Sequence, residues 1–443
     1  MSRYYIFLLL LIFISNELVS QNTWSRVYGG PEDDFAYSVK QTPDGGYVVL
    51  GISGISDQSA WLLKLDENGD TVWTKSFDST MLEYSLDIEI DYDSGYILAI
   101  NKVTPSIDAN LRIVKTDELG NIIWSEIYDL SIPTIDYPYD LDKTSDSGYI
   151  VVGNAMFQNS STFIIKLDQN GDSVWATLTG EEMFFTGVIE NLSNGYFATG
   201  RGNPYYGATI AEYDSLGNCI SWKSYDDHYS NDIEMLKDSN YIVGTSTHLL
   251  KIDENLDTIW SRNIGAMDVE PCFDGGFVTT YFLNSDAYLN KYTCDGDSVW
   301  SVYFGGPEGD KFYSISRTTD GGYICCGHTN SWGNGGFDYY IVKTDSQGLV
   351  GVEEEFIQQY PQYPDITIEN RSSRQVKISF IQPIDGNISF SVYDLSGRMI
   401  ERPLEGFLEK GECTITLTGY RPGVYFYRMN VGEEEWRGKF QVY

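Results

Sequence analysis

The chain is poor in histidine and in basic residues. Its 443 residues include three histidines and 29 lysines and arginines, against 64 aspartates and glutamates, which gives a formal net charge of −35. A protein that binds nucleic acid needs a basic surface to neutralise phosphate, so this excess of acid excludes most nucleic-acid partners. The three histidines, His228, His248 and His328, lack metal-binding spacing, and histidine-ligated zinc and histidine-based triads therefore have little material.

Long apolar runs are missing beyond the N-terminus. Arg3, the apolar residues 6–14 and the polar residues 15–20 are typical of a signal peptide, to which we assign residues 1–20. That run is too short to span a bilayer, so we expect no transmembrane segment in the mature chain. Disulfide spacing is missing as well: the six cysteines include no Cys-x-x-Cys pair. The adjacent Cys325 and Cys326 fit small core residues, with a strained bridge between them as the alternative.

Helical periodicity is also absent, while tryptophan recurs at spacings of 38 to 51 residues: Trp24, Trp73, Trp124, Trp175, Trp222, Trp260 and Trp300. Such a period is typical of solenoids, propellers and arrays. Within the first unit, residues 36–41, 47–50, 61–65 and 71–73 are short apolar or alternating runs separated by Asp, Asn and Gly turns. Four short strands per unit predict one blade of a β-propeller.

The number of blades follows from the aromatic residue after the first turn of each unit. It recurs seven times: Tyr47, Tyr96, Tyr149, Tyr196, Tyr241, Phe277 and Tyr323. The seventh unit lacks its own fourth strand, because Val352 stands where tryptophan is due. We expect residues 23–28 to supply that strand, since closing the ring removes exposed sheet edges. The fold class predicted for residues 21–352 is therefore all-β, a seven-bladed propeller, and this domain holds −31 of the net charge.

The string Lys-x-Asp-x-x-Gly-x-x-x-Trp, as in residues 64–73, resembles the Trp-docking segment of quinoprotein-like propellers. The wider repeat resembles those of secreted bacterial propellers over residues 22–350. The resemblance implies architecture more than activity. Quinone-dependent dehydrogenases usually have eight blades and a defined cofactor ligand set; seven blades are counted here and no such set is assigned.

The C-terminal part has a different pattern. After a linker at residues 353–364, residues 365–443 contain alternating runs at 376–380, 388–393, 413–417, 423–427 and 439–442, which predict a small antiparallel β-sandwich. The segments at 391–398, 420–427 and 438–442 resemble, in order, those of the C-terminal sorting domain of the type IX secretion system. The Asn-Pro usual at the start of that domain is replaced by Tyr363-Pro-Asp365. The resemblance implies type IX secretion machinery as a partner and a secreted or outer-membrane surface location; a generic adhesive sandwich is the alternative.

One position of the first strand of each unit is small or acidic in all seven. It reads Ser38, Asp87, Asp140, Gly187, Asp232, Asp268 and Ser314, and an apolar residue follows each of them. If this strand is the innermost one, Asp87, Asp140, Asp232 and Asp268 lie near the central channel. Clustered carboxylates suit a hard cation such as calcium, so they form the predicted metal site. A water-filled channel lined by small polar residues is the alternative.

Ligand contacts are expected on the loops before the first strand and between the second and third strands, where propeller loops gather on one face. The candidates are Asp34, Tyr137, Tyr139, Tyr205, Tyr206, Asp310 and Trp332. Aromatic and polar side chains together suit a glycan-stacking or protein-binding surface; packing against neighbouring loops is the alternative. We expect a binding or structural module and assign no catalytic residue. The other hypothesis is a secreted hydrolase or quinone-type redox enzyme using the same face.

Overall fold

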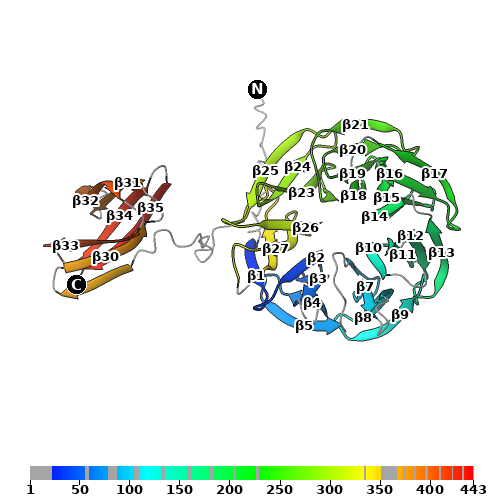
Figure 1. Cartoon of the computed structure of the whole chain (residues 1–443), viewed down its shortest axis with the longest axis horizontal. Coiled ribbons are helices and arrows are strands. Elements are labelled where there is room, and N and C mark those ends of the chain that lie inside the picture. Colours follow the sequence, from blue (N-terminus) through cyan, green and yellow to red (C-terminus); the bar gives the residue numbers. More distant parts are fainter. Residues whose placement is uncertain are drawn as a thin grey trace, which may run out of the picture. The chain divides into compact units, whose positions relative to one another are not determined.

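In the computed structural model the chain divides into two compact units, Met1–Phe356 and Ile357–Tyr443, both drawn in Figure 1. The structure describes residues 22–350 and 367–442 apart from the short segments 55–58, 78–86, 104–108, 131–134, 157–160, 180–182, 203–205, 226–228, 334–335, 373–374, 383–385, 395–397, 409–410, 422 and 432–433. The predicted signal peptide and the predicted linker lie outside these residues. Every secondary-structure element in the described part is a strand, so this part contains no helix that could cross a membrane.

The first unit is a ring of seven four-stranded antiparallel blades (Figure 1). Blades 1 and 2 comprise β2 (Asp34–Gln41), β3 (Tyr47–Ser53), β4 (Ser59–Leu65), β5 (Thr71–Phe77) and β6 (Asp87–Ile90), β7 (Tyr96–Val103), β8 (Ala109–Thr116), β9 (Ile122–Tyr128). Blades 3 and 4 comprise β10 (Ile135–Lys143), β11 (Tyr149–Met156), β12 (Ser161–Leu167), β13 (Ser173–Thr179) and β14 (Met183–Glu190), β15 (Tyr196–Gly202), β16 (Tyr206–Tyr213), β17 (Cys219–Ser224).

Blades 5 and 6 comprise β18 (Ser230–Met235), β19 (Tyr241–Thr245), β20 (Leu249–Ile252), β21 (Thr258–Arg262) and β22 (Asp268–Pro271), β23 (Phe277–Leu283), β24 (Asp286–Tyr292), β25 (Ser298–Phe304). Blade 7 comprises β26 (Asp310–Arg317), β27 (Tyr323–Thr329), β28 (Asp338–Thr344) and β1 (Trp24–Tyr28). The first strand of each blade is innermost, and the apolar residue at the second aligned position is buried in all seven: Val39, Ile88, Leu141, Val188, Ile233, Val269 and Ile315. The seven-bladed prediction is confirmed.

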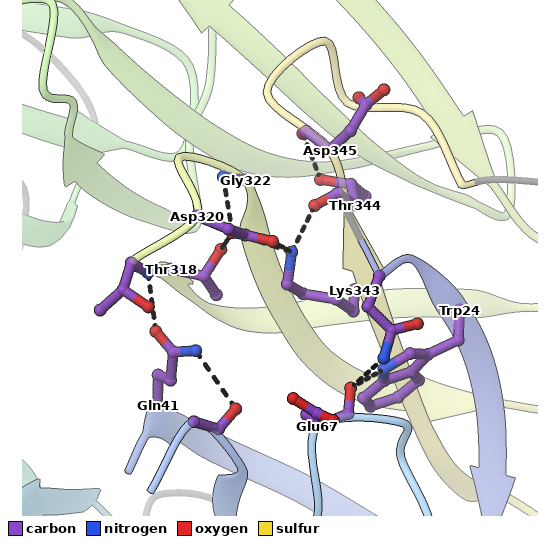
Figure 2. A network of polar contacts seen from close by, with 12 residues as sticks. Trp24, Gln41, Glu67, Thr318, Asp320, Gly322, Lys343, Thr344 and Asp345 are labelled. Atoms are coloured by element: carbon purple, nitrogen blue, oxygen red, sulfur yellow. Dashed lines mark hydrogen bonds and ion pairs between the residues drawn. The ribbon is translucent and has the colours of Figure 1, made fainter. Parts of the chain in front are cut away.

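The N-terminal strand closes the ring, as predicted. β1 pairs antiparallel with β28, with Trp24 opposite Lys343. Across the next junction the Trp24 indole N–H donates to the Glu67 carbonyl at 3.0 Å, and the Thr319 N–H donates to the Gln41 side-chain oxygen at 2.7 Å. Figure 2 shows these contacts beside the Lys343–Asp320 pair. Residues from opposite ends of the propeller sequence thus bond blade 7 to blade 1.

Tryptophans of the outer strands dock on glycines of the next blade. In six junctions the indole lies where a glycine side chain would be, against the left-handed glycine of the outer hairpin: Trp24 on Gly69, Trp73 on Gly120, Trp124 on Gly171, Trp175 on Gly217, Trp260 on Gly296 and Trp300 on Gly348. Glycine leaves room for the ring at these turns and adopts their positive φ without the strain that a side chain would bring. The repeating Gly and Trp of the sequence therefore form one contact between neighbouring blades.

Blade 4 departs from this pattern, and here the tryptophan alignment is wrong. Trp124 pairs with Lys115 across its hairpin, but Ser221 pairs with Glu212, and Trp222 stands one residue later. Trp222 is consequently 57% exposed. In the next blade the docking glycine is replaced by Leu256, which has φ of 63° and is buried. The Leu256 side chain fills the space that an indole fills elsewhere, so both partners of the contact have changed together.

In every blade except blade 4, a lysine pairs with an aspartate in the first turn of its own blade. Lys64, Lys166, Lys251, Lys291 and Lys343 are each at most 5% exposed and bond to an aspartate in the first turn of their own blade, at 2.6 to 3.0 Å. Lys115 pairs with Asp91 and Asp93 in the same way. Burying an ammonium is costly unless it is paired. Blade 4 has Glu212 for the lysine and Ser193 for the aspartate, so again both members differ.

The second unit is a two-sheet sandwich. One sheet has the order β29 (Thr367–Ser372), β30 (Gln375–Gln382), β33 (Gly411–Thr418), and the other β32 (Met399–Leu408), β31 (Gly386–Tyr393), β34 (Gly423–Val431), β35 (Glu434–Val442). Ile378, Phe390 and Met429 are buried between the sheets. The five predicted strands are present. β29 and β32 were not predicted; β32 contains Pro403, lies at a sheet edge and is mostly exposed, so it lacks the alternation of a half-buried strand.

Candidate functional site

The predicted aspartates do line the central channel. A cavity of about 80 Å³ lies on the inner strands, and its wall includes Asp87, Asp140, Asp232 and Asp268 together with Ser38 and Ser314. Their positions follow from the innermost place of the first strand in each blade. The structure therefore places the four predicted residues in the wall of one cavity.

Each of these aspartates also bonds to the next blade. The side-chain Oδ2 of Asp87 accepts the Leu141 N–H at 3.0 Å, and that of Asp140 accepts the Val188 N–H at 2.6 Å. Asp232 accepts from Val269 at 3.0 Å and Asp268 from Ile315 at 2.7 Å. A carboxylate that accepts a buried backbone N–H satisfies a donor that would otherwise cost free energy. These side chains therefore hold adjacent inner strands together.

A second acidic ring, which sequence reasoning missed, lies two residues further along the same strands. It contains Glu89, Asp142, Glu234 and Glu270, and Lys40 is the one lysine among the described residues that line the cavity. Residues two apart in a strand point to the same face, so this ring could have been found by moving two positions along the first alignment. Lys40 forms an ion pair with Glu89, and the Arg317 Nε lies 3.3 Å from the Glu270 Oε1.

Burial and mutual repulsion disturb the titration of the channel. Burial, followed by the charges of Asp87 and Asp232, raises the pKa of Asp140 well above its ordinary value; burial and Asp232 do the same to the pKa of Asp268 and of Glu234. Burial above all raises the pKa of Asp142 and of Glu270 to about 7. Burial alone would lower the pKa of Lys40, but Glu89 and Asp87 raise it well above its usual range. The channel thus favours protons, or another source of positive charge.

Calcium binding by Asp87, Asp140, Asp232 and Asp268 stays a prediction. Within the described part of the chain, no group of three or more His, Cys, Asp or Glu side chains is arranged to hold an ion. The inter-blade hydrogen bonds give the four aspartates a structural role that does not need one. Calorimetric titration of Ca²⁺ into the metal-free protein checks the prediction, and absence of both heat and a shift in melting temperature contradicts it.

The loops before the first strand of a blade and between its second and third strands lie on one face of the propeller, as expected, and we call it the loop face. The antiparallel pairing of the strands brings these loops together: Asp34 at the start of β2 is opposite Ser53 at the end of β3. Asp34 is buried and accepts the Gly30 and Gly54 N–H groups at 2.7 and 3.2 Å. Asp310 is buried and accepts from Gly306 and from the Ser331 hydroxyl, both at 2.7 Å. Both carboxylates therefore fix loops.

The other predicted ligand residues are placed differently from one another. Tyr137 is buried, and Trp332 packs against Tyr340 with ring centroids 5.3 Å apart. Tyr139 is partly exposed. Tyr205 lies outside the described residues, and of Tyr206 only the backbone is described, opposite Gly202 at the start of β16.

Around Tyr139 the structure assembles an aromatic cluster with an arginine at its centre, which we call the Arg201 patch: Tyr139, Phe184, Arg201 and Tyr229. Phe184 and Arg201 are opposite each other on β14 and β15. The guanidinium carbon lies 4.6 Å from the Phe184 ring centroid and 5.8 Å from that of Tyr229, and the Tyr139 and Phe184 rings are 5.4 Å apart. Arg201 is exposed and Tyr229 is 50% exposed.

The Arg201 patch is composed of residues from three blades, which explains why the sequence did not reveal it. Tyr139 belongs to blade 3, Phe184 and Arg201 to blade 4, and Tyr229 directly precedes the first strand of blade 5. Ring contacts hold the guanidinium, and in the part of the chain that the structure describes this group makes no hydrogen bond or ion pair. Its five N–H donors therefore remain available to a ligand.

Fold and tail define an exported β-propeller that carries its sorting signal at the C-terminus. Residues 370–443 match the family described as the secretion system C-terminal sorting domain, which indicates export and a secreted or cell-surface location and confirms the resemblance seen in the sequence. No curated protein matches the chain.

Two solved structures have a distant likeness to it. A protein of unknown function from Bacteroides caccae aligns with 62% of this chain and 94% of its own, at 10% identity and a TM-score of 0.36. The extracellular domain of a protein described as a hybrid two-component system of B. thetaiotaomicron aligns with 93% of this chain and 55% of its own, at 10% identity and a TM-score of 0.46. Neither likeness supports an inference about activity.

Proposed function

We propose that the propeller is a non-catalytic module that binds glycan at the cell surface or outside the cell, where the sorting domain delivers it. The observation that carries the proposal is the Arg201 patch. Aromatic faces stack on the C–H faces of sugar rings, and a guanidinium offers a planar fork of donors to sugar or carboxylate oxygens. Both features occur together on the loop face, where propellers present their ligand contacts.

The energetics of the patch favour a preformed site. Phe184 and Tyr229 hold the guanidinium between them, so little side-chain freedom is lost when a ligand binds. An exposed aromatic residue beside an arginine is also the composition of binding hot spots. A protein ligand would use the same features, and it is therefore the competing outcome of the test.

The test is a glycan array probed with the purified full chain and with the variants Arg201→Gln and Tyr229→Ala. The matched control is Trp222→Ala, which removes an aromatic residue of similar exposure from the outer strand of blade 4, away from the patch. We expect each patch variant to weaken glycan binding about tenfold or more, which corresponds to about 1.4 kcal/mol, and the control to bind as the parent does. Binding to no glycan, or equal loss in the control, contradicts the proposal.

A further inference from the structure

A second cationic cluster lies on the loop face at the seam between blades 7 and 1. Lys311 on β26 and His328 on β27 are direct partners across the strand pair. The Lys311 Nζ lies 4.6 Å from the centroid of the Tyr313 ring, and the His328 ring lies 5.3 Å from the same ring. The three side chains thus form one compact group.

Aromatic rings surround His328 on its other sides. Phe35 of blade 1 meets it edge-on at 5.1 Å, and Phe337, just before β28, at 4.7 Å. Two carboxylates border the group. Asp33 accepts the Phe337 N–H at 2.9 Å, and Asp310 precedes Lys311 but bonds to Gly306 and Ser331. Because neighbouring strand residues point to opposite faces, Asp310 faces away from Lys311.

Both nitrogen groups of the pair lack the partners that such groups normally have. Within the described residues the Lys311 ammonium makes no hydrogen bond and no ion pair, although the residue is only partly exposed. His328 Nδ1 is buried and has no hydrogen-bond partner. The buried lysines of the blades, by contrast, all have an aspartate. An unpaired polar group away from water is costly, and in native proteins it calls for a specific explanation.

The charge of the group matches a monoanion. Burial lowers the pKa of Lys311. Burial, and next the charge of Lys311, lower the pKa of His328 to about 4. The imidazole is therefore neutral at pH 7, so the Lys311 ammonium is the one positive charge that this group can offer an anion. A dianion such as phosphate would exceed that charge in a domain of net charge −31.

We propose that Lys311 and the rings of Tyr313 and His328 form a binding site for the carboxylate of an acidic sugar. The carboxylate pairs with the Lys311 ammonium, and the sugar ring packs on the adjacent aromatic surface. This site is separate from the Arg201 patch, which belongs to blades 3 to 5, and the inference does not depend on that patch.

The chain has three histidines, so their ring signals can be resolved by nuclear magnetic resonance and assigned with His228→Gln and His248→Gln. The probe is sodium glucuronate added to the full-length protein, with glucose, acetate and a triglutamate peptide as comparison ligands. A bound carboxylate next to His328 favours its protonated form, so we expect a saturable rise of its pKa above about 4 with glucuronate. We expect glucose to leave it unchanged and acetate to bind about tenfold more weakly or worse.

Lys311→Met should abolish the glucuronate effect, whereas Lys75→Met, which removes a lysine bonded to Asn121 on the outer rim, should leave it intact. Unchanged far-ultraviolet circular dichroism and melting temperature establish that the Lys311 variant is folded. A His328 signal that glucuronate does not move, or a response that survives in Lys311→Met, overturns the site. Acetate or triglutamate binding as tightly as glucuronate overturns the assignment to an acidic sugar. Loss of glucuronate binding in Arg201→Gln would place the sugar at the Arg201 patch instead and also overturn the inference.

Discussion

Trp124 lies against Gly171 in the space that a side chain on that glycine would need: a Cβ there would lie 2.8 Å from the indole ring. The same relationship holds at six of the seven junctions between blades. At these six junctions a blade is therefore positioned on its neighbour by a contact that tolerates no added methyl group.

Gly171→Ala should destabilise the propeller more than Gly45→Ala. Both glycines have nearly the same left-handed φ, 86° and 85°, but nothing lies within 4 Å of a Cβ at Gly45. The shared backbone strain is about 1 kcal/mol, and the collision with Trp124 should add about 1–3 kcal/mol at Gly171 alone. Urea unfolding of the two variants measures the difference. Equal losses of stability would show that the indole yields without cost.

Leu256→Gly should be rescued by Ser221→Trp. Removing the buried leucine should cost about 2–4 kcal/mol, and Ser221→Trp alone should also destabilise, because its indole would meet Leu256. Together they restore the contact of the other junctions, so a double-mutant cycle should give a favourable coupling of at least about 1 kcal/mol. Additive losses would refute the exchange of partners. Trp222→Ala, at an exposed position, should change stability by less than about 0.5 kcal/mol.

The propeller should be more stable at pH 5.5 than at pH 8.5. Asp142 and Glu270 have ordinary pKa values of 3.8 and 4.5 and values of about 7 in the fold. The folded chain therefore holds protons that the unfolded chain releases, so this stabilisation is complete below pH 4 and is lost as the pH rises through 7. Between pH 5.5 and 8.5 the two groups together contribute about 4 kcal/mol, or roughly 5–10 °C in melting temperature. Scanning calorimetry measures the melting temperature across this range, and a melting temperature that does not change from pH 5.5 to 8.5 contradicts the prediction.

At still lower pH another set of groups reverses the trend. Burial would raise the pKa values of Asp44, Asp146 and Asp274, but their hydrogen bonds, including those from the blade lysines, lower them. Stability from these groups is present above their ordinary pKa of 3.8 and is lost as the pH falls below it. The stability maximum should thus lie at about pH 4, and the double variant Asp142→Asn/Glu270→Gln should flatten the alkaline side of the profile alone.

Asp140→Asn and Asp140→Ala should have opposite effects at pH 8.5. The amide keeps an oxygen for the Val188 N–H and removes a charge from the acidic ring, so the melting temperature should rise by a few degrees, about 1 kcal/mol. Alanine leaves that buried N–H without an acceptor and should cost about 1–3 kcal/mol. Thermal denaturation separates the two. Equal destabilisation by both variants would mean that the carboxylate charge itself is required, as calcium binding would demand.

Deleting residues 365–443 should keep the propeller from reaching the cell surface or the medium, because the sorting domain lies in that segment. Immunoblots of periplasm and culture medium measure the distribution. Joining the signal peptide and residues 365–443 to an unrelated soluble protein is the reciprocal experiment and should export it. Undiminished secretion of the shortened chain would refute the role of the tail.

The architecture was accessible from the sequence because its determinants are local. Seven turns, each followed by Tyr or Phe, fixed the number of blades, and the missing tryptophan near Val352 pointed to closure by residues 23–28. Each of these features depends on a few consecutive residues. The same reasoning failed at Trp222, since a one-residue change of register in blade 4 cannot be seen without the pairing of Ser221 with Glu212.

The sites were less accessible because they combine residues from several blades. Arg201 meets Tyr229 and Lys311 meets His328 only through strand pairing and blade packing, which no spacing in the sequence records. Asp34 and Asp310 are of a residue type common in ligand contacts, yet in the fold their carboxylates accept hydrogen bonds that fix the loops. Glu234, by contrast, was within reach, since it follows Asp232 by two residues on the same strand face.

The pairing of β1 with β28 has a consequence for export. A chain that crosses the inner membrane from its N-terminus exposes residues 24–28 more than 300 residues before their partners at 339–343. Completion of the ring has to wait for this distant contact, and the sorting domain emerges directly after it. A chain truncated before blade 7 lacks both the strand that pairs with β1 and the sorting domain. Because of this order of segments, an incomplete propeller has no signal for delivery to the surface.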